Sequence, residues 1–95
     1  MDKIAIIYTM KGCPYCVELK EMLDDSNIEY INRDIDEYDE EYKMFSEVVG
    51  NEYVPALMLI ENPENTPKVN LYAPERDYNE LEDAVKIIKE FYERW

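Results

Sequence analysis

The sequence predicts an α/β fold in which a four-stranded mixed sheet carries helices on both of its faces. Short apolar, β-branched runs alternate with segments whose apolar residues recur at helical spacing, in the order strand–helix–strand–helix–strand–strand–helix. The last two strands are separated only by a short polar connection, which favours a hairpin. Because 95 residues are enough for one hydrophobic core and not for two, we expect residues 1–95 to form a single domain.

The first three elements follow from apolar patterning and from residues typical of helix ends. Segment 3–9 is apolar on both faces, as in a strand buried between two layers. Segment 14–26 predicts a helix, with Pro14 suited to its first turn and Asn27 able to end it. Segment 28–35 alternates apolar and polar residues, which predicts a strand. The expected buried face of the helix consists of Cys16, Leu19, Met22 and Leu23.

The second half supplies another helix, the hairpin and a final helix. Segment 36–49 has helical spacing and is closed by Gly50, and its expected core residues are Tyr38, Tyr42, Phe45 and Val49. Segments 56–61 and 67–73 are the two hairpin strands. A last helix is expected over 77–95, and it would bury Leu81, Val85, Ile88, Phe91 or Tyr92, and Trp95.

The charge of the chain excludes several classes of partner. A net charge of −13 opposes binding to nucleic acid or to anionic membranes, which both attract lysine and arginine. The longest uncharged apolar run, 54–60, is far too short to cross a bilayer.

The N-terminus has an acidic residue at position 2 and no small-residue cleavage site, so it indicates an opening strand and not a signal peptide. We therefore expect a cytoplasmic protein.

The only two cysteines, Cys13 and Cys16, are separated by two residues, and the chain has no histidine. A zinc site normally takes four Cys or His ligands, so one chain cannot provide it and only a metal bridging two chains remains possible. A purely structural disulfide across so small a loop would stabilise little. Redox chemistry is favoured because a C-x-x-C motif follows the first strand of a βαβ unit. We expect no bound metal in a monomer.

The position of the two thiols assigns them different roles. Cys13 is expected at the exposed N-terminus of the helix, where unpaired backbone N–H groups and the helix dipole favour thiolate. The pKa of a cysteine in such a C-x-x-C setting is lowered. Cys16 is expected one turn later and deeper. Cys13 is therefore the candidate nucleophile, and Cys16 is the candidate resolving thiol.

Pro55 stands at the start of the strand 56–61, where a proline does not interrupt the sheet. We predict a cis Val54–Pro55 bond that brings the Val54 backbone beside the Cys13 sulfur. Val54 would then offer its N–H and C=O groups to an extended substrate. The alternative is a proline that merely begins a strand.

The stretches "YTMKGCPYC" (8–16) and "YVPALMLI" (53–60) resemble the glutaredoxin family, over about residues 3–60. The resemblance implies a thioredoxin-like fold, no bound cofactor, and glutathione as the reducing co-substrate. It also implies reduction of protein disulfides and glutathione mixed disulfides through Cys13 and Cys16, with ribonucleotide reductase as a candidate protein substrate. We expect a monomer. The residues expected along the glutathione groove are Lys11, Pro14, Tyr15, Val54, Pro55, Arg76 and Asp77.

The last third of the chain departs from that family. In place of its Gly-Gly-x-Asp turn stands "LYAPERDYNEL" (71–81), which has no glycine and resembles the end of a thioredoxin or protein disulfide isomerase domain. Since glycine allows close approach of backbone to ligand, we expect weakened glutathione binding, partly compensated by Arg76 or Lys11. Asp77 would cap the last helix or meet an ammonium group. The alternatives are a dithiol donor fed by thioredoxin reductase and a non-catalytic binding module of the same fold.

Overall fold

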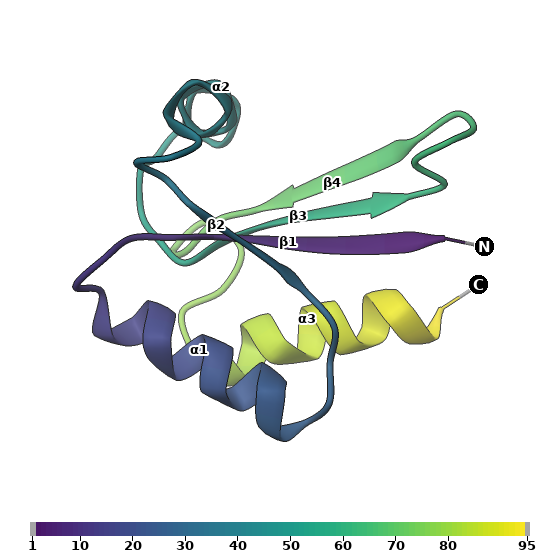
Figure 1. Ribbon diagram of the computed structural model, residues 1–95, viewed down its shortest axis with the longest axis horizontal. Helices are drawn as coiled ribbons and strands as arrows, with labels where there is room; N and C mark the ends of the chain where they lie inside the picture. The colour runs from purple at the N-terminus through teal and green to yellow at the C-terminus, as the bar shows by residue number, and fades with distance from the viewer. Residues whose placement is uncertain (1, 95) are drawn as a thin grey trace.

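The computed structural model describes residues 2–94, in which four strands form one sheet between two layers of helix (Figure 1). The elements in chain order are β1 (Lys3–Thr9), α1 (Pro14–Asp25), β2 (Ile31–Asp34), α2 (Asp39–Val49), β3 (Ala56–Glu61), β4 (Lys68–Tyr72) and α3 (Leu81–Glu93). This is the predicted order of strands and helices. None of the helices in residues 2–94 combines the length and the apolar character needed to cross a membrane.

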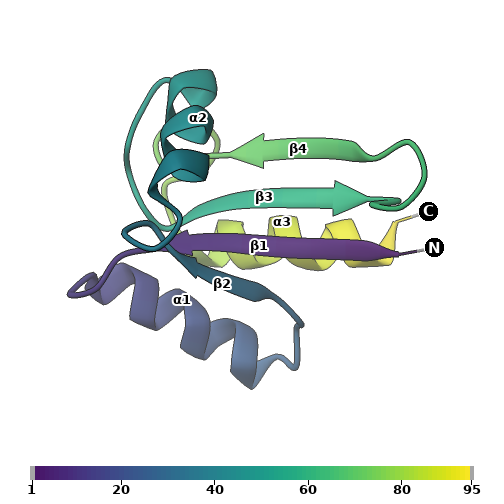
Figure 2. The ribbon, with the colours of Figure 1, turned by 45° about the horizontal axis from the view of Figure 1, so that its top comes forward.

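The sheet is mixed, and its order is β2-β1-β3-β4. β1 runs parallel to β2, with Ile6 opposite Ile31, and antiparallel to β3, with Tyr8 opposite Ala56. β3 and β4 form the predicted antiparallel hairpin, which extends beyond the helices at one end of the sheet (Figure 2). The parallel pair joined by α1 and the hairpin that follows are the layout of a thioredoxin-like fold.

Each face of the sheet has its own core because successive residues of β1 point to opposite sides. Ala5 and Ile7 point to the face covered by α1 and α3, whereas Ile6 and Tyr8 point to the face covered by α2 (Figure 1). The α1–α3 core includes Leu19, Leu23, Leu57, Leu59, Ala84, Ile88 and Phe91. The α2 core includes Tyr42, Phe45, Val49 and Ala56. Helices on both faces are therefore confirmed.

Both predicted helix ends are confirmed. At the end of α1 the N–H of Asn27 donates to the carbonyl of Asp24 at 3.1 Å, and the N–H of Ile28 to that of Leu23 at 2.9 Å. Asn27 has a φ of 56° in this arrangement, which an asparagine tolerates better than most residues. Gly50, with a φ of 85°, ends α2 in the same left-handed conformation.

Three predicted element starts differ from the observed ones by more than one residue. β2 covers only 31–34 because Ile28 and Tyr30, which alternate like strand residues, pack against the α1–α3 core before the strand begins. The helix expected from 36 begins at Asp39, since the N–H groups of Glu37 and Tyr38 close a turn on the Asp34 carbonyl. Tyr38, expected in the core, is exposed instead. The last helix begins at Leu81 and not at 77, and Trp95 lies outside the described residues.

A partly buried polar network ties α2 to the sheet. The fully buried Tyr8 donates its hydroxyl to Glu41 at 2.6 Å, and Arg33 donates to the other oxygen of that carboxylate at 2.5 Å. Burial, followed by the hydrogen bond to Glu41, raises the pKa of Tyr8 well above its usual range. Burial acts to raise the pKa of Glu41 as well, but hydrogen bonds from Tyr8 and Arg33 outweigh burial and lower it.

The replacement Glu41→Ala is expected to lower the free energy of unfolding by about 1.5–3 kcal/mol, because a buried hydroxyl loses a charged acceptor. Chemical denaturation at pH 7 measures this loss. Glu40→Ala is the matched control, since Glu40 is an exposed acid in the same first turn of α2. Because the pKa of Glu41 is lowered from 4.5, its contribution is full above pH 4.5 and is lost as the pH falls further. Equal losses in the two variants would contradict the network's contribution.

Candidate functional site

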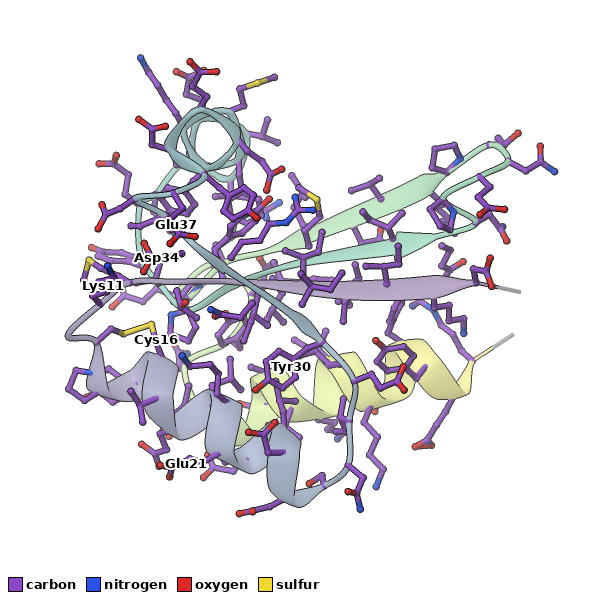
Figure 3. The ribbon with its side chains drawn as sticks, viewed as in Figure 1. Lys11, Cys16, Glu21, Tyr30, Asp34 and Glu37 are labelled. Atoms are coloured by element: carbon purple, nitrogen blue, oxygen red, sulfur yellow. A yellow bond between two sulfur atoms is a disulfide. The ribbon has the colours of Figure 1, made fainter. Side chains whose placement is uncertain are left out.

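Cys13 and Cys16 lie where β1 passes into α1, and a disulfide joins them (Figure 3). The turn between strand and helix requires a φ of 77° at Gly12, and Cys13 follows as the N-cap of α1. The Cys13 sulfur accepts a hydrogen bond from the backbone N–H of Cys16 at 3.1 Å. Pro14 occupies the first helical turn, where its missing N–H costs nothing. The sequence therefore folds locally so that one sulfur caps the helix that carries the other.

Cys13 is less exposed than predicted, whereas Cys16 is buried as predicted. Cys13 was expected to be exposed, but only 7% of its surface is accessible, compared with 1% for Cys16. The reason is that the Cys13 sulfur is directed back onto the first turn of α1, where Cys16 supplies both its disulfide partner and an N–H donor. Cys13 is still the more accessible of the pair. An attacking group from outside therefore reaches Cys13 more readily than Cys16.

The Val54–Pro55 peptide bond is cis, as predicted, and Pro55 is buried directly before β3. Its carbonyl accepts a hydrogen bond from the hydroxyl of Tyr78, which is buried in the turn that precedes α3. Burial, with the nearby Asp77 charge as a second cause, raises the pKa of Tyr78 well above its usual range. Tyr78 was not among the predicted site residues. The sequence feature that could have indicated its role is a lone aromatic residue within the polar stretch before the last helix.

Substituting phenylalanine for Tyr78 is expected to lower the free energy of unfolding by about 1–3 kcal/mol, because the Pro55 carbonyl loses its donor. Thermal or urea unfolding measures the loss. Since the pKa of Tyr78 is raised above 10.0, its share of the stability is full below pH 10 and is lost as the pH rises further. Tyr78→Phe should therefore lose less stability than the wild type between neutral pH and pH values above 10. An identical alkaline loss in both proteins would show that Tyr78 does not contribute.

The turn from Ala73 to Tyr78 is held together by its own charged residues. One oxygen of the Asp77 carboxylate accepts from the Ala73 N–H at 2.8 Å and from the Arg76 guanidinium at 3.1 Å. Arg76 also donates to the Leu71 carbonyl at 3.4 Å. Asp77 does not act as the N-cap of the last helix, because Glu80 occupies that position. Two residues predicted to contact a ligand thus pair with each other.

A groove of about 580 Å³ separates the start of α1 from the turn before α3. Three of the predicted site residues line it together, namely Tyr15, Val54 and Pro55. Tyr53 and Tyr78 line it too. Within the described chain, the other predicted groove residues lie outside this lining. Lys11 is exposed in the turn before Cys13, at the same end of the molecule as Cys16 (Figure 3), and Pro14, Arg76 and Asp77 occupy the positions described above.

The potential metal-ligating side chains of the described residues do not form a metal centre within one chain. Across residues 2–94, no three His, Cys, Asp or Glu side chains gather closely enough to hold a metal ion. The two sulfurs are bonded to each other, and a sulfur pair of this kind can pass between disulfide and dithiol by exchange with outside thiols. The chemistry available at this end of the molecule is therefore thiol–disulfide exchange.

Comparison with known proteins agrees with this arrangement. The family model for glutaredoxin matches residues 5–62, which include both cysteines, Val54 and Pro55. The chain belongs to the glutaredoxin family. Curated relatives include two proteins named glutaredoxin 1, from Rickettsia felis and Rickettsia conorii, at 32% and 30% identity over 56 residues. In each case the match covers 57% of this glutaredoxin-family chain and 55% of the relative. The chain therefore spans about half the length of the curated relatives that it matches. No solved structure matches the chain.

Proposed function

We propose that this chain is a thiol-disulfide oxidoreductase that reduces protein disulfides and glutathione mixed disulfides, with glutathione as its reducing co-substrate. The observation that carries the proposal is the Cys13–Cys16 pair at the start of α1, in a chain of the glutaredoxin family. We extend the proposal to a monomeric, cytoplasmic protein with no bound cofactor. Ribonucleotide reductase, which the family resemblance suggested, is a candidate protein substrate.

The reaction begins from the reduced protein. The Cys13 thiolate attacks one sulfur of the substrate disulfide, that S–S bond breaks, and the departing thiolate takes a proton from solvent. Cys16 then loses its proton and attacks the Cys13 sulfur, which breaks the mixed disulfide and releases the second substrate thiol. Two electrons have passed to the substrate, and the protein is left with the Cys13–Cys16 disulfide. Two glutathione thiols restore the dithiol by the same exchange and leave as glutathione disulfide.

The surroundings of the pair support the assigned roles. Cys16 is almost completely buried beneath Cys13, which suits a thiol that attacks only its neighbour. In this proposal Val54 offers backbone N–H and C=O groups to an extended substrate, and Tyr15, Pro14 and Pro55 form the adjoining wall. Lys11 provides a positive charge for a glutathione carboxylate, and Arg76 and Asp77 meet the other end of glutathione only if their mutual pairing opens.

The turn from Ala73 to Asp77 supports a second candidate for the electron donor. This turn has no glycine, and its acid already binds a backbone N–H and a guanidinium. The alternative is therefore a dithiol donor that is reduced by thioredoxin reductase. A non-catalytic binding module is less well supported, because both thiols are present and joined.

One assay tests the proposal and separates the two donors. Reduction of a small glutathione mixed disulfide is followed once with glutathione and glutathione reductase and once with thioredoxin reductase. Turnover in the first system supports the proposed function, and turnover confined to the second supports the alternative donor. Absence of turnover in both systems, and with a protein disulfide as substrate, would favour the binding module.

A further inference from the structure

We propose that the groove beside the Cys13–Cys16 disulfide accepts a cationic polypeptide, one with lysine or arginine residues near its disulfide. This inference rests on the proposed function and names a substrate class for the same site. Every charged residue that lines the groove within the described chain is a glutamate: Glu18, Glu75, Glu80 and Glu82. Neither cysteine lines the groove, but Tyr15, which stands between Cys13 and Cys16 in the sequence, does, and this places the groove next to the redox pair. The glutamates give the groove its charge.

The four glutamates are not neutralised by the protein. The ion pairs formed within residues 2–94 are Arg33–Glu41, Arg76–Asp77 and Arg94–Glu61, so none involves a groove glutamate. Arg76 follows Glu75 directly in the sequence, but its guanidinium pairs with Asp77. All four glutamates are exposed to solvent. Their negative charge is therefore available to an incoming partner.

The glutamates face the groove from both of its sides. Glu18 lies on α1, one turn after Tyr15, whereas Glu80 and Glu82 lie at the start of α3 and Glu75 in the turn before it. A polypeptide that binds along the groove therefore has carboxylates on both of its sides. Clefts lined by charge of one sign raise the association rate of oppositely charged ligands by about 10–10³-fold.

Aromatic side chains add a second feature that suits cations. Tyr15 is 65% exposed and Tyr53 is 54% exposed, and both line the groove. The face of an exposed tyrosine ring attracts lysine and arginine side chains. Carboxylates together with exposed ring faces therefore favour a basic polypeptide over a neutral one.

The same charges disfavour small acidic thiol compounds. Glutathione carries two carboxylates and one ammonium group, so its net charge opposes that of the groove. A basic protein segment presents the opposite sign, and the exchange chemistry is unchanged. Cys13 still takes one sulfur of the segment's disulfide, Cys16 displaces it, and two electrons pass to the segment. The groove therefore selects substrates by charge while the thiols perform the reaction.

The test uses pre-reduced protein and two synthetic peptides of equal length, each with one internal disulfide. One peptide has lysines on both sides of the disulfide and the other has glutamates. The second-order rate constant for reduction is measured by acid quench and chromatography. We expect the lysine peptide to be reduced at least about tenfold faster at low ionic strength. The ratio should fall toward one at about 0.5 M salt, because exposed charges are then screened.

Two quadruple variants locate the effect. The groove variant combines Glu18→Gln, Glu75→Gln, Glu80→Gln and Glu82→Gln. The control variant has the same change in net charge and combines Glu21→Gln, Glu64→Gln, Glu90→Gln and Glu93→Gln. All four control residues are exposed and outside the groove lining, and Glu21 points away from the sheet on α1 (Figure 3). We expect the groove variant to lose most of the preference for the lysine peptide and the control variant to keep it.

Equal rates for the two peptides with the wild type would overturn the charge selection and leave the proposed function intact. Equal loss of the preference in both variants would overturn the assignment to the groove. If the groove variant does not fold, the salt dependence of the wild type still decides whether charge selects the substrate. Reduction of neither peptide by a wild type that still turns over a glutathione mixed disulfide would overturn this inference and leave the proposed function intact, whereas failure to reduce any of these disulfides would overturn both.

Discussion

Replacing Cys13 with serine is expected to abolish disulfide reduction, leaving only the uncatalysed rate. The proposed reaction begins with attack by the Cys13 sulfur, and a serine hydroxyl cannot form or exchange a disulfide. Cys16 cannot take over the first step, because this residue of the first turn of α1 is almost completely buried. The measurement is the reduction rate of a protein disulfide and of a glutathione mixed disulfide.

Cys16→Ser is the matched control for that loss. This variant keeps the attacking sulfur and loses only the resolving one, so it should retain reactions that stop at a mixed disulfide between Cys13 and glutathione. Reduction of protein disulfides should fall, because nothing within the chain then releases the trapped substrate. Equal loss in both variants, for both substrates, would remove the distinction between the two thiols.

Alkylation of the reduced wild type tests the same assignment without a substitution. Iodoacetamide should label Cys13 first, because a thiol at a helix N-terminus is stabilised as thiolate and Cys13 is the more accessible of the two. Peptide mapping after brief labelling identifies the modified residue. Faster labelling of Cys16 would contradict the assigned order of attack.

The centre of the fold was predictable because local patterns and tertiary packing agree there. The two-sided apolar run of β1, the proline that opens α1 and the left-handed residues Asn27 and Gly50 each admit few alternatives. The cis bond at Pro55 was predicted and is confirmed, but the position of a proline at the start of a strand was equally compatible with the alternative of a proline that merely begins the strand. These features place both cysteines, Val54 and Pro55 at one end of the sheet.

The parts that were not predictable depend on contacts between residues distant in sequence, or on hydrogen bonds with no pattern. Ile28 and Tyr30 alternate as a strand would, yet they pack on the α1–α3 core outside β2. Tyr78 reaches the Pro55 carbonyl across 23 residues of sequence separation. The ion pair between Arg76 and Asp77 is likewise not indicated by any periodic pattern in the sequence. That pairing matters most, because it occupies the two charged side chains that the turn before α3 could otherwise offer to a ligand.

Glutathione is expected to be used with a Michaelis constant at least about tenfold above that of family members whose turn contains two glycines. In this chain the Ala73 N–H already donates to Asp77, and Pro74 has no N–H to donate. Each missing hydrogen bond to a charged group is worth about 1.5–3 kcal/mol, which corresponds to about tenfold or more in affinity. Arg76 is engaged with Asp77, so Lys11 is left to compensate by charge.

Introducing Ala73→Gly together with Pro74→Gly should lower that Michaelis constant by about tenfold with little change in kcat, because position 74 regains a backbone N–H donor. Ala73→Gly alone is the matched control, since it adds no donor and should bring little improvement. Steady-state kinetics with varied glutathione and glutathione reductase measures both. If the double variant and the single variant behave alike, the missing N–H is not what limits glutathione use. If the wild type instead ignores glutathione and accepts electrons from thioredoxin reductase, the sequence after β4 indicates the electron donor better than the cysteine motif does.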